Sequence, residues 1–285
     1  MNTSLSSQEF QLFQRYIEEQ CGIRILNEKA YLIESRLSKF LIQFGLDSFE
    51  ELYWLLSQQS QKNLAEKIID AMTTNETLWF REQTPWKIME QKLLPEYIQA
   101  LRQESCDKIR IWSAACASGQ EPYSIAMCLD HYLVEHHIQD ITLDHFEILA
   151  TDISHTVLRM AKMGKYDNIS MARGLSKEYR DRYFEQKGRI WTLDKHIKER
   201  VQFKQFNLQE SFLFLGKFDL IFFRYVAIYF SDLFRTEVVH KITAALKDKG
   251  VLIWGNSEVF LNYQDDYEAE NYDSANFYRL RSGDA

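Results

Sequence analysis

Apolar residues recur every three or four positions through residues 1–84, which is the spacing of a buried helix face. Residues that favour helix ends separate these stretches: Ser6 and Ser48 precede two of them, and Gly45 ends another. The pattern predicts four short helices, and therefore a small all-helical N-terminal domain over residues 1–84. The inward-facing positions are Phe10, Phe13 and Ile17 in the first helix, Ala30, Ile33, Leu37, Phe40, Leu41 and Phe44 in the second, and Phe49, Leu52, Leu55 and Leu56 in the third, while residues 63–72 form the fourth.

A polar cluster, residues 73–77, follows the fourth helix. Thr and Asn favour helix caps and turns, so the cluster by itself indicates a linker. Pro85 is predicted to open a helix that runs through Leu94, and Pro95 to open another, because proline is tolerated at the first helical position.

From Ile109 onward, short apolar runs alternate with helical stretches. Such alternation is typical of an α/β fold whose mainly parallel strands are covered on both faces. The expected strands cover residues 109–112, 146–150, 201–206, 218–223 and 251–254, and residues 277–280 alternate as an edge strand does. Residues 188–193 are compatible with one half of a small hairpin.

The segment 113–121 joins the first expected strand to a helix and consists mainly of small residues. Glu121 and Pro122 indicate the helix start, since an acid suits the positive end of a helix. Small side chains let the backbone approach a ligand at the carboxyl edge of a parallel sheet. Gly119 is the only glycine of this loop, so the dinucleotide fingerprint and the P-loop are both absent. A tight connection without a ligand is the alternative.

Asp152 follows the second expected strand at the same edge of the sheet. A carboxylate in this place can accept two hydrogen bonds from a ribose diol, so Asp152 is a candidate for binding a nucleoside.

Composition narrows the function classes. The chain has 41 acidic and 34 basic residues and a net charge of −7, which argues against nucleic acid as the main partner. The sequence shows no secretory signal and no apolar run of about 18 residues, so we expect a cytoplasmic protein without a membrane span. The four cysteines lack Cys-x-x-Cys spacing and no two histidines are four apart, so we expect reduced thiols and no metal site.

Five motifs in order resemble one family. They are TTNETLWFRE, IRIWSAACASGQEPYS, ILATDIS, FDLIFFRYVAIYF and GVLIWGNSEVF. Together they resemble the CheR-type protein-glutamate O-methyltransferases of bacterial chemotaxis. The resemblance implies a class I, Rossmann-like S-adenosylmethionine (SAM) methyltransferase domain over residues 85–285, with a seven-stranded sheet whose last strand is antiparallel. It also implies a small β-subdomain inserted at about residues 179–200.

The resemblance further implies the reaction, which is methyl transfer from SAM to glutamate side chains of a chemoreceptor or related signalling protein, with S-adenosylhomocysteine (SAH) as product. The implied catalytic residues are Arg81, Arg224 and Tyr229. The implied cofactor-binding residues are Asn75, Thr77, Arg81, Ala115, Glu121, Asp152, Asn207, Leu208 and Arg224.

This chemistry asks little of the protein. A glutamate carboxylate is already ionised near pH 7, so no general base is required. Catalysis can then come from holding the reacting atoms in line, an effect worth up to ~7–11 kcal/mol. Arg81 and Arg224 are candidates for gathering a carboxylate of substrate or cofactor, and Tyr229 for placing a hydroxyl nearby. Structural ion pairing is the alternative role for both arginines.

Three features depart from the family pattern. Tyr225 stands where the family usually has Asn, which brings bulk and a single hydroxyl. The second helix carries Arg36 and Lys39 but continues with apolar residues, and residues 1–84 hold eight Lys/Arg against twelve Asp/Glu, a net charge of −4. An electrostatic grip on an acidic receptor helix is therefore not expected. The loop at 186–188 is short, so a tether for a receptor's C-terminal peptide is not expected either.

The leading hypothesis is an active protein-glutamate methyltransferase. The alternative is a signalling module that binds SAM or SAH without turnover, and Tyr225 is the residue that motivates it. A nucleic-acid or small-molecule methyltransferase fits less well, because the 218–230 motif lacks the Asn/Asp-Pro-Pro-aromatic signature of amino-methylating enzymes.

Overall fold

The computed structural model describes residues 4–58, 62–255, 258, 265–272 and 275–282. Contacts divide the chain into two compact units. The first comprises residues 1–74 with 207–210 and 227–238, and the second comprises 75–206, 211–226 and 239–285. The first unit therefore takes up two short segments from the C-terminal half of the sequence.

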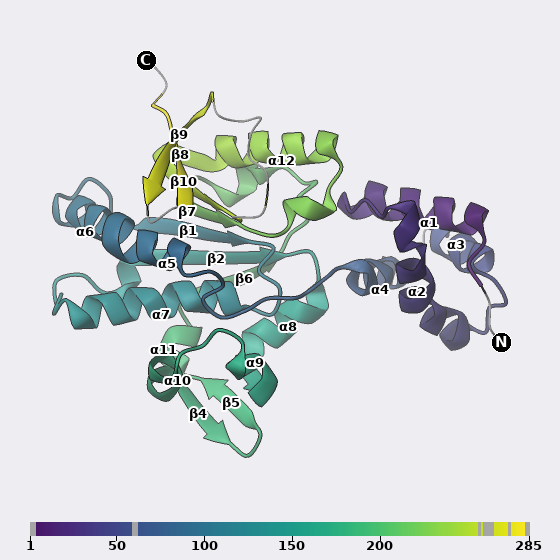
Figure 1. Ribbon diagram of the computed structural model, residues 1–285, viewed down its shortest axis with the longest axis horizontal. Coiled ribbons are helices and arrows are strands. Elements are labelled where there is room, and N and C mark those ends of the chain that lie inside the picture. Colours follow the sequence, from purple (N-terminus) through teal and green to yellow (C-terminus); the bar gives the residue numbers. More distant parts are fainter. Residues whose placement is uncertain (1–3, 59–61, 256–257, 259–264, 273–274, 283–285) are drawn as a thin grey trace. The chain divides into compact units, whose positions relative to one another are not determined.

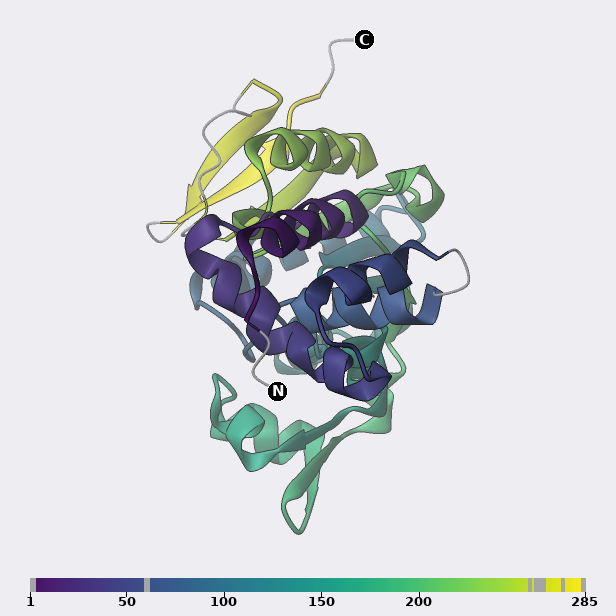
Figure 2. The ribbon, with the colours of Figure 1, turned by 90° about the vertical axis from the view of Figure 1, so that its right-hand side faces the viewer.

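The first unit is built on helices, as the hydrophobic spacing predicts. Ser6 begins α1 by accepting the N–H of Glu9 through its side chain, and Ser48 does the same for α3. Gly45 ends α2 in the left-handed conformation. Figure 2 shows these helices packed against one another in the purple-to-blue part of the chain. Their bounds are α1 Ser7–Cys21, η1 Asn27–Lys29, α2 Ala30–Phe44, α3 Phe49–Ser57 and α4 Lys62–Met72, and η5 Ala227–Tyr229 belongs to the same unit.

The charge on α2 is partly used inside this unit. The Arg36 guanidinium donates a hydrogen bond of 2.8 Å to the carbonyl of Met72 at the end of α4. A cation suits the negative end of a helix, so Arg36 stabilises the fold of the unit.

The second unit is organised around a seven-stranded sheet with the order β6-β2-β1-β7-β8-β10-β9 (Figure 1). The pairs β6–β2, β2–β1, β1–β7 and β7–β8 are parallel, and β10 runs antiparallel to both β8 and β9. This is the sheet that the resemblance implied. The strands are β1 Ile109–Ala114, β2 Phe146–Asp152, β6 Val201–Gln205, β7 Phe218–Phe223, β8 Leu246–Trp254, β9 Tyr267–Tyr272 and β10 Ala275–Leu280.

The expectation of an edge strand at residues 277–280 is wrong. These residues lie in β10, which pairs on both sides, while β9 forms the edge. The strand β9, YEAENY, carries too little apolar periodicity to be found from sequence. Without it, the alternation of β10 indicated an outer position.

Helices cover the sheet, and one of them differs from the prediction. Pro95 stands in the first turn of α6, as predicted, but α6 follows α5 without a break, because a π-helical turn, η2, joins the two. The N–H of Leu94 donates to the carbonyl of Met89, five residues earlier, so the helix continues into the turn that contains the proline. The remaining bounds are α5 Thr84–Ile88, η2 Met89–Leu93, α6 Leu94–Arg102, α7 Gln120–Glu135, η3 Leu143–His145, α8 His155–Met163, η4 Phe212–Leu215 and α12 Asp232–Ala245.

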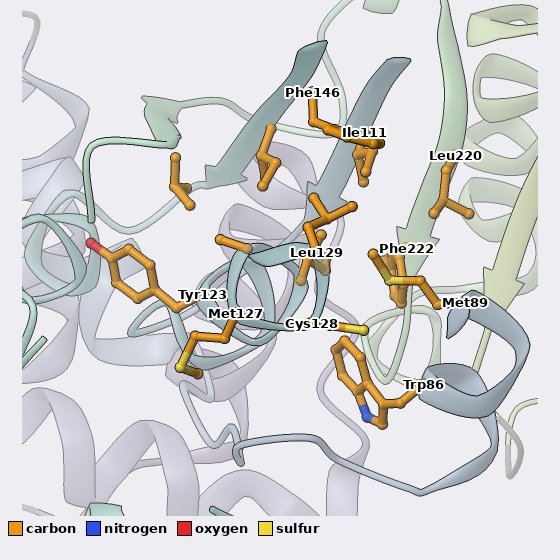
Figure 3. Close-up of a cluster of buried hydrophobic side chains, with 14 of the residues drawn as sticks. Trp86, Met89, Ile111, Tyr123, Met127, Cys128, Leu129, Phe146, Leu220 and Phe222 are labelled. Atoms are coloured by element: carbon orange, nitrogen blue, oxygen red, sulfur yellow. The ribbon is translucent and has the colours of Figure 1, made fainter. Parts of the chain in front are cut away.

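A continuous apolar core joins α5, η2 and α7 to the central strands (Figure 3). Trp86 stacks on Phe222 of β7 with ring centroids 5.8 Å apart. Met89, Cys128 and Ile111 of β1 lie in the same cluster, with Met89 next to Phe222. This packing fixes α7, and with it the loop that precedes α7, against the sheet.

A small three-stranded sheet, order β3-β5-β4, is inserted between α8 and β6. The hairpin of β4 and β5 turns at Gly188, which has a φ of +64°, and it projects downward in Figure 2. The insertion begins at Lys165, earlier than the expected residue 179, because β3 pairs with β5. Its elements are β3 Lys165–Asp167, α9 Asn168–Ala172, α10 Lys177–Tyr183, β4 Phe184–Lys187, β5 Ile190–Leu193 and α11 Lys195–Lys198.

Residues 75–84 pack within the second unit and do not act as a linker. Trp79 is fully buried, with its ring centroid 4.8 Å from that of Tyr166 and 5.3 Å from that of Phe184. The backbone N–H of Trp79 donates to the carbonyl of Arg173 (3.1 Å). The division between the units accordingly falls after Thr74, ten residues before the boundary expected from helical spacing.

We expect Gly174→Ala to destabilise the second unit. Gly174 has a φ of +94°, and a Cβ there would overlap the carbonyl oxygen of Trp79. Left-handed strain of ~1–2 kcal/mol and overpacking of ~1–3 kcal/mol predict a loss of about 3 kcal/mol in the free energy of unfolding, measured by urea titration. The control is Gly188→Ala, where φ is +64° but the space is open, and about 1 kcal/mol is expected. Equal losses at the two positions would contradict the packing argument.

Candidate active site

The loop after β1 turns through residues with left-handed backbone. The angle φ is +57° at Ala115, +47° at Ala117 and +91° at Gly119, a region that bulky and β-branched residues avoid. Gly119 is further constrained, because a Cβ there would lie 2.9 Å from the Cβ of Ala161 in α8. The small residues seen in the sequence therefore allow a sharp turn into α7.

Asp152 connects this loop to the end of β2. One oxygen of its carboxylate accepts the N–H of Ala117 and the other accepts that of Ser154, both at 2.9 Å. The N–H of Cys116 donates to the carbonyl of Thr151 (2.9 Å). Asp152 is buried, with 6% of its surface exposed. Asp152 thus holds the loop at the end of β2, and its role on a ribose stays a prediction.

Arg224, directly after β7, lies between two carboxylates. Its Nη2 is 2.7 Å from Oε2 of Glu82, and its Nη1 is 2.9 Å from Oε2 of Glu121. Nη2 also donates to the carbonyl of Arg81 (2.5 Å), and Oε1 of Glu121 accepts the hydroxyl of Ser113 (2.8 Å). The Arg224 side chain is 1% exposed. This buried cluster joins the end of β7, the first turn of α7 and the segment before α5.

Tyr225 links the same cluster to Arg81. The Cζ of Arg81 lies 3.3 Å from the centroid of the Tyr225 ring, and the Tyr225 hydroxyl donates to Glu82. The Tyr225 N–H donates to Oε2 of Glu258 (2.5 Å). Burial, together with the hydrogen bond to Glu82, raises the pKa of Tyr225 above its usual value. The phenol therefore stays protonated near neutral pH and acts as a donor.

The two arginines are in different environments. Both terminal nitrogens of Arg224 are paired with acids, Nη2 with Glu82 and Nη1 with Glu121, although its buried Nε has no hydrogen-bond partner among the described residues. The guanidinium of Arg81, by contrast, forms no ion pair with any residue in the described ranges. Arg81 is partly exposed. The ion pairs of Arg224 agree with the structural alternative, and Arg81 has no competing anion among the described residues. The catalytic and cofactor roles of both arginines stay predictions.

The second unit holds most of the predicted site residues. Ala115, Glu121 and Asp152 lie at the carboxyl ends of neighbouring parallel strands, where α/β sheets bind ligands. Asn75 and Thr77 are partly buried in the segment before Trp79.

The other predicted positions belong to the first unit. The side-chain amide of Asn207 donates to the carbonyl of Gln20 (2.8 Å), and Leu208 is buried. The carbonyl of Tyr229 accepts the N–H of Arg24 (2.8 Å). The cofactor and catalytic roles assigned to these three positions from the resemblance stay predictions.

Sequence reasoning missed Glu82, Ser113 and Glu258 as members of the site. Glu82 follows Arg81 in the first motif, and its only signal was that adjacency. Ser113 and Glu258 also stand inside quoted motifs, but nothing in their spacing indicates that they face Glu121 and Tyr225. Their hydrogen bonds span non-local contacts that only the folded chain brings about.

Metal and thiol chemistry find no support in the described residues. Within those ranges no group of three or more His, Cys, Asp or Glu could hold a metal ion. Burial raises the pKa of Cys116 well above its usual value, so this loop thiol is protonated and packs as a small apolar group. Among the described residues, no helix has both the length and the apolar character needed to span a bilayer.

Two family models match the chain. One, described as the CheR methyltransferase SAM binding domain, covers residues 75–275, and the other, the CheR methyltransferase all-alpha domain, covers residues 8–73. The chain belongs to the CheR methyltransferase family. It is therefore a SAM-dependent methyltransferase with an all-α N-terminal domain, and the expectations of fold class and cofactor are confirmed.

Curated relatives span nearly the whole chain. Chemotaxis protein methyltransferase Cher2 of Pseudomonas putida is 41% identical over 266 residues, covering 93% of this chain and 95% of the relative. Chemotaxis protein methyltransferase 1 of Pseudomonas aeruginosa is 40% identical over 283 residues, covering 98% and 100%. Among solved structures, the N-methyltransferase NodS from Bradyrhizobium japonicum, in complex with SAH, is 13% identical, covers 72% of this chain and 95% of its own, and has a TM-score of 0.38.

The described residues fit SAM as the cofactor. The glycine-poor loop at Ala115 has small side chains, and the buried carboxylate of Asp152 is bonded to it through the N–H of Ala117. Glu121 adds negative charge next to Arg224 at the same edge. Acidic groups at this place suit a ligand that carries a sulfonium, an ammonium and a ribose diol.

Substitution of the two arginines should affect stability and activity differently. Arg224→Met should lower the free energy of unfolding by ~3–5 kcal/mol, since it leaves Glu82 and Glu121 without their cation. Arg81→Met should change it by less than ~1 kcal/mol, because only a cation–π contact is lost, yet reduce methyl transfer strongly. Arg81→Lys should restore transfer only in part, because an ammonium lacks the planar fork. Denaturant titration and initial rates measure both quantities, and a similar stability loss in Arg81→Met and Arg224→Met would refute the distinction.

Asp152→Ala should weaken the binding of SAM and SAH. Removing the acceptor of buried hydroxyl groups costs ~1–3 kcal/mol, which isothermal calorimetry would measure as about 5- to 150-fold in Kd. The control is Asp219→Ala at the opposite end of the sheet, where the carboxylate accepts from the N–H of Arg110 and from Lys247 (both 2.7 Å). The control should lower stability and leave SAM affinity unchanged. Unchanged affinity in a folded Asp152→Ala protein would exclude the ribose assignment.

Proposed function

We propose that this protein transfers a methyl group from SAM to glutamate side chains of a chemoreceptor or related signalling protein, forming glutamate methyl esters and SAH. The observation that carries the proposal is the difference between the two arginines near the end of β7. The buried guanidinium of Arg224 is paired with two partly buried acids, while Arg81 beside it meets no anion in the described part of the chain. Such a site suits a carboxylate ligand at Arg81.

The acceptor's chemistry fits residues that bind and orient. A glutamate side chain with a pKa near ~4.3 is ionised at neutral pH, so the protein need not remove a proton. SAM, when bound, supplies a methyl group activated by its sulfonium. Arg81 attracts and orients a carboxylate, and Asp152 and Glu121 hold the loop and helix start that face it. Rate enhancement by orientation of this kind reaches ~7–11 kcal/mol.

The names of the relatives support the partner class. Proteins about 40% identical over almost the whole chain are chemotaxis protein methyltransferases, and chemoreceptors are the substrates that this name implies. The acidic balance of residues 1–84 gives no support to an electrostatic grip on an acidic helix, because α2 carries Arg36 in an internal bond at the end of α4. We propose neither nucleic acid as a partner nor a tether for a C-terminal receptor peptide.

The test is methyl transfer from radiolabelled SAM to membranes that contain the native chemoreceptors. The expected product is label that is released as methanol by mild base, since a methyl ester hydrolyses and an N-methyl group does not. Arg81→Ala should reduce this signal at least tenfold at equal protein stability, which removes ~1.4 kcal/mol or more of transition-state stabilisation.

The same assay separates the alternative function. A protein that binds SAM and SAH in calorimetry but transfers no base-labile label would be a cofactor-binding signalling module. The observation that favours this alternative is Tyr225, whose ring lies against Arg81. Label that resists base would instead indicate N-methylation and would overturn the glutamate proposal.

A further inference from the structure

Tyr225 is held by contacts on three sides. Its ring lies under the Arg81 guanidinium, with Cζ 3.3 Å from the ring centroid, and its hydroxyl donates to Oε1 of Glu82. Oε2 of the same Glu82 is 2.7 Å from Nη2 of Arg224. The Tyr225 backbone N–H donates to Glu258. The phenol therefore connects Arg81, which has no ion-pair partner in the described ranges, to the ion-pair cluster of Arg224.

The backbone of Tyr225 is strained. Its φ is +60°, a left-handed conformation that Asn adopts readily and that an aromatic residue rarely adopts. Glu82, which accepts the Tyr225 hydroxyl, is itself at +61°. Strained residues of this kind persist where the surrounding contacts hold them, and they cluster at functional sites. A tyrosine at this position needs a side-chain contact that offsets the strain.

The contact that sets Tyr225 apart is the stacking of its ring on Arg81. Arg224 also lies near the ring, with its Cζ 5.6 Å from the centroid, but its guanidinium is already fixed by Glu82 and Glu121. Arg81 has no such anchor among the described residues, and an unanchored arginine side chain has many rotamers. The ring restricts Arg81 without neutralising its charge, since a cation–π contact leaves the guanidinium N–H groups able to donate.

We propose that Tyr225 is a positioning residue that fixes the Arg81 guanidinium, through its ring, in the orientation that receives a carboxylate. This inference deepens the proposed function and rests on it where the carboxylate is that of the substrate glutamate. SAM and SAH also carry a carboxylate, so coupling seen in SAH binding assigns Arg81 to the cofactor, and coupling seen only in kcat/KM assigns it to the substrate. The hydroxyl of Tyr225 has the secondary task of fixing the ring through Glu82. An Asn at this position could not fix Arg81 in this way, because Asn has no ring for the guanidinium to lie on.

A double-mutant cycle tests the coupling. Binding of SAH to the full-length protein is measured by calorimetry for wild type, Tyr225→Leu, Arg81→Ala and the double variant. Tyr225→Leu should weaken SAH binding about tenfold, or lower kcat/KM on receptor-containing membranes about tenfold, and it should have no further effect once Arg81 is replaced. Independent effects of the two substitutions in both assays would overturn the proposal, as would an unchanged Kd and kcat/KM in Tyr225→Leu.

Conservative variants separate positioning from stability. Tyr225→Phe keeps the ring and should stay within about threefold of wild type. Tyr225→Asn relieves the left-handed strain, so it should melt at the same temperature as wild type or higher while losing affinity or turnover as Tyr225→Leu does. Higher turnover in Tyr225→Asn would show that the ring obstructs the site, which contradicts the proposal.

A matched control uses another arginine–aromatic pair of this unit, away from the ion-pair cluster. Arg180 lies over Trp191 in the inserted sheet at 5.2 Å, and Trp191→Leu should leave SAH affinity unchanged. Calorimetry with SAH needs no methyl acceptor. Coupling between Tyr225 and Arg81 can therefore be measured even if the protein transfers no methyl group to glutamate. Failure of this inference is thus distinguishable from failure of the proposed function.

Discussion

The buried ion pair of Arg224 with Glu82 and Glu121 is the constraint on which the rest of the site depends. A guanidinium that is 1% exposed is stable only if its charge is compensated by nearby acids. That requirement fixes three segments far apart in sequence: the chain before α5, the first turn of α7 and the end of β7. The loop after β1, which Asp152 also holds, therefore ends at a fixed helix start.

This arrangement explains how one site can hold two arginines with different tasks. Arg224 uses its charge on the protein itself, whereas Arg81 meets no anion among the described residues and rests on the ring of Tyr225, where we propose that it receives a carboxylate. Methyl transfer to an ionised carboxylate needs orientation more than acid–base chemistry. A protein that performs it needs rigid positions for a few charged groups.

Left-handed residues concentrate at the same place. Ala115, Ala117 and Gly119 turn the first loop, while Glu82 and Tyr225 take this conformation at the ion-pair cluster. Glycine adopts it at little cost, whereas the two alanines are strained there. Glu82 and Tyr225 keep it because hydrogen bonds and stacking hold them. The strain is thus distributed over the elements that face the ligand.

The sequence by itself determined the helices of the first unit, most parallel strands and the loop after β1, because apolar periodicity and capping residues are local signals. The five motifs, taken as a resemblance, further gave the family, the cofactor and the region of the site. Only the tertiary structure decided that Trp79 carries residues 75–84 into the core of the second unit and that β10 is an inner strand. It also decided that Arg224 pairs with two acids while Arg81 pairs with none among the described residues. Each of these depends on which distant segments come into contact, and burial and charge compensation settle that only once the chain has folded.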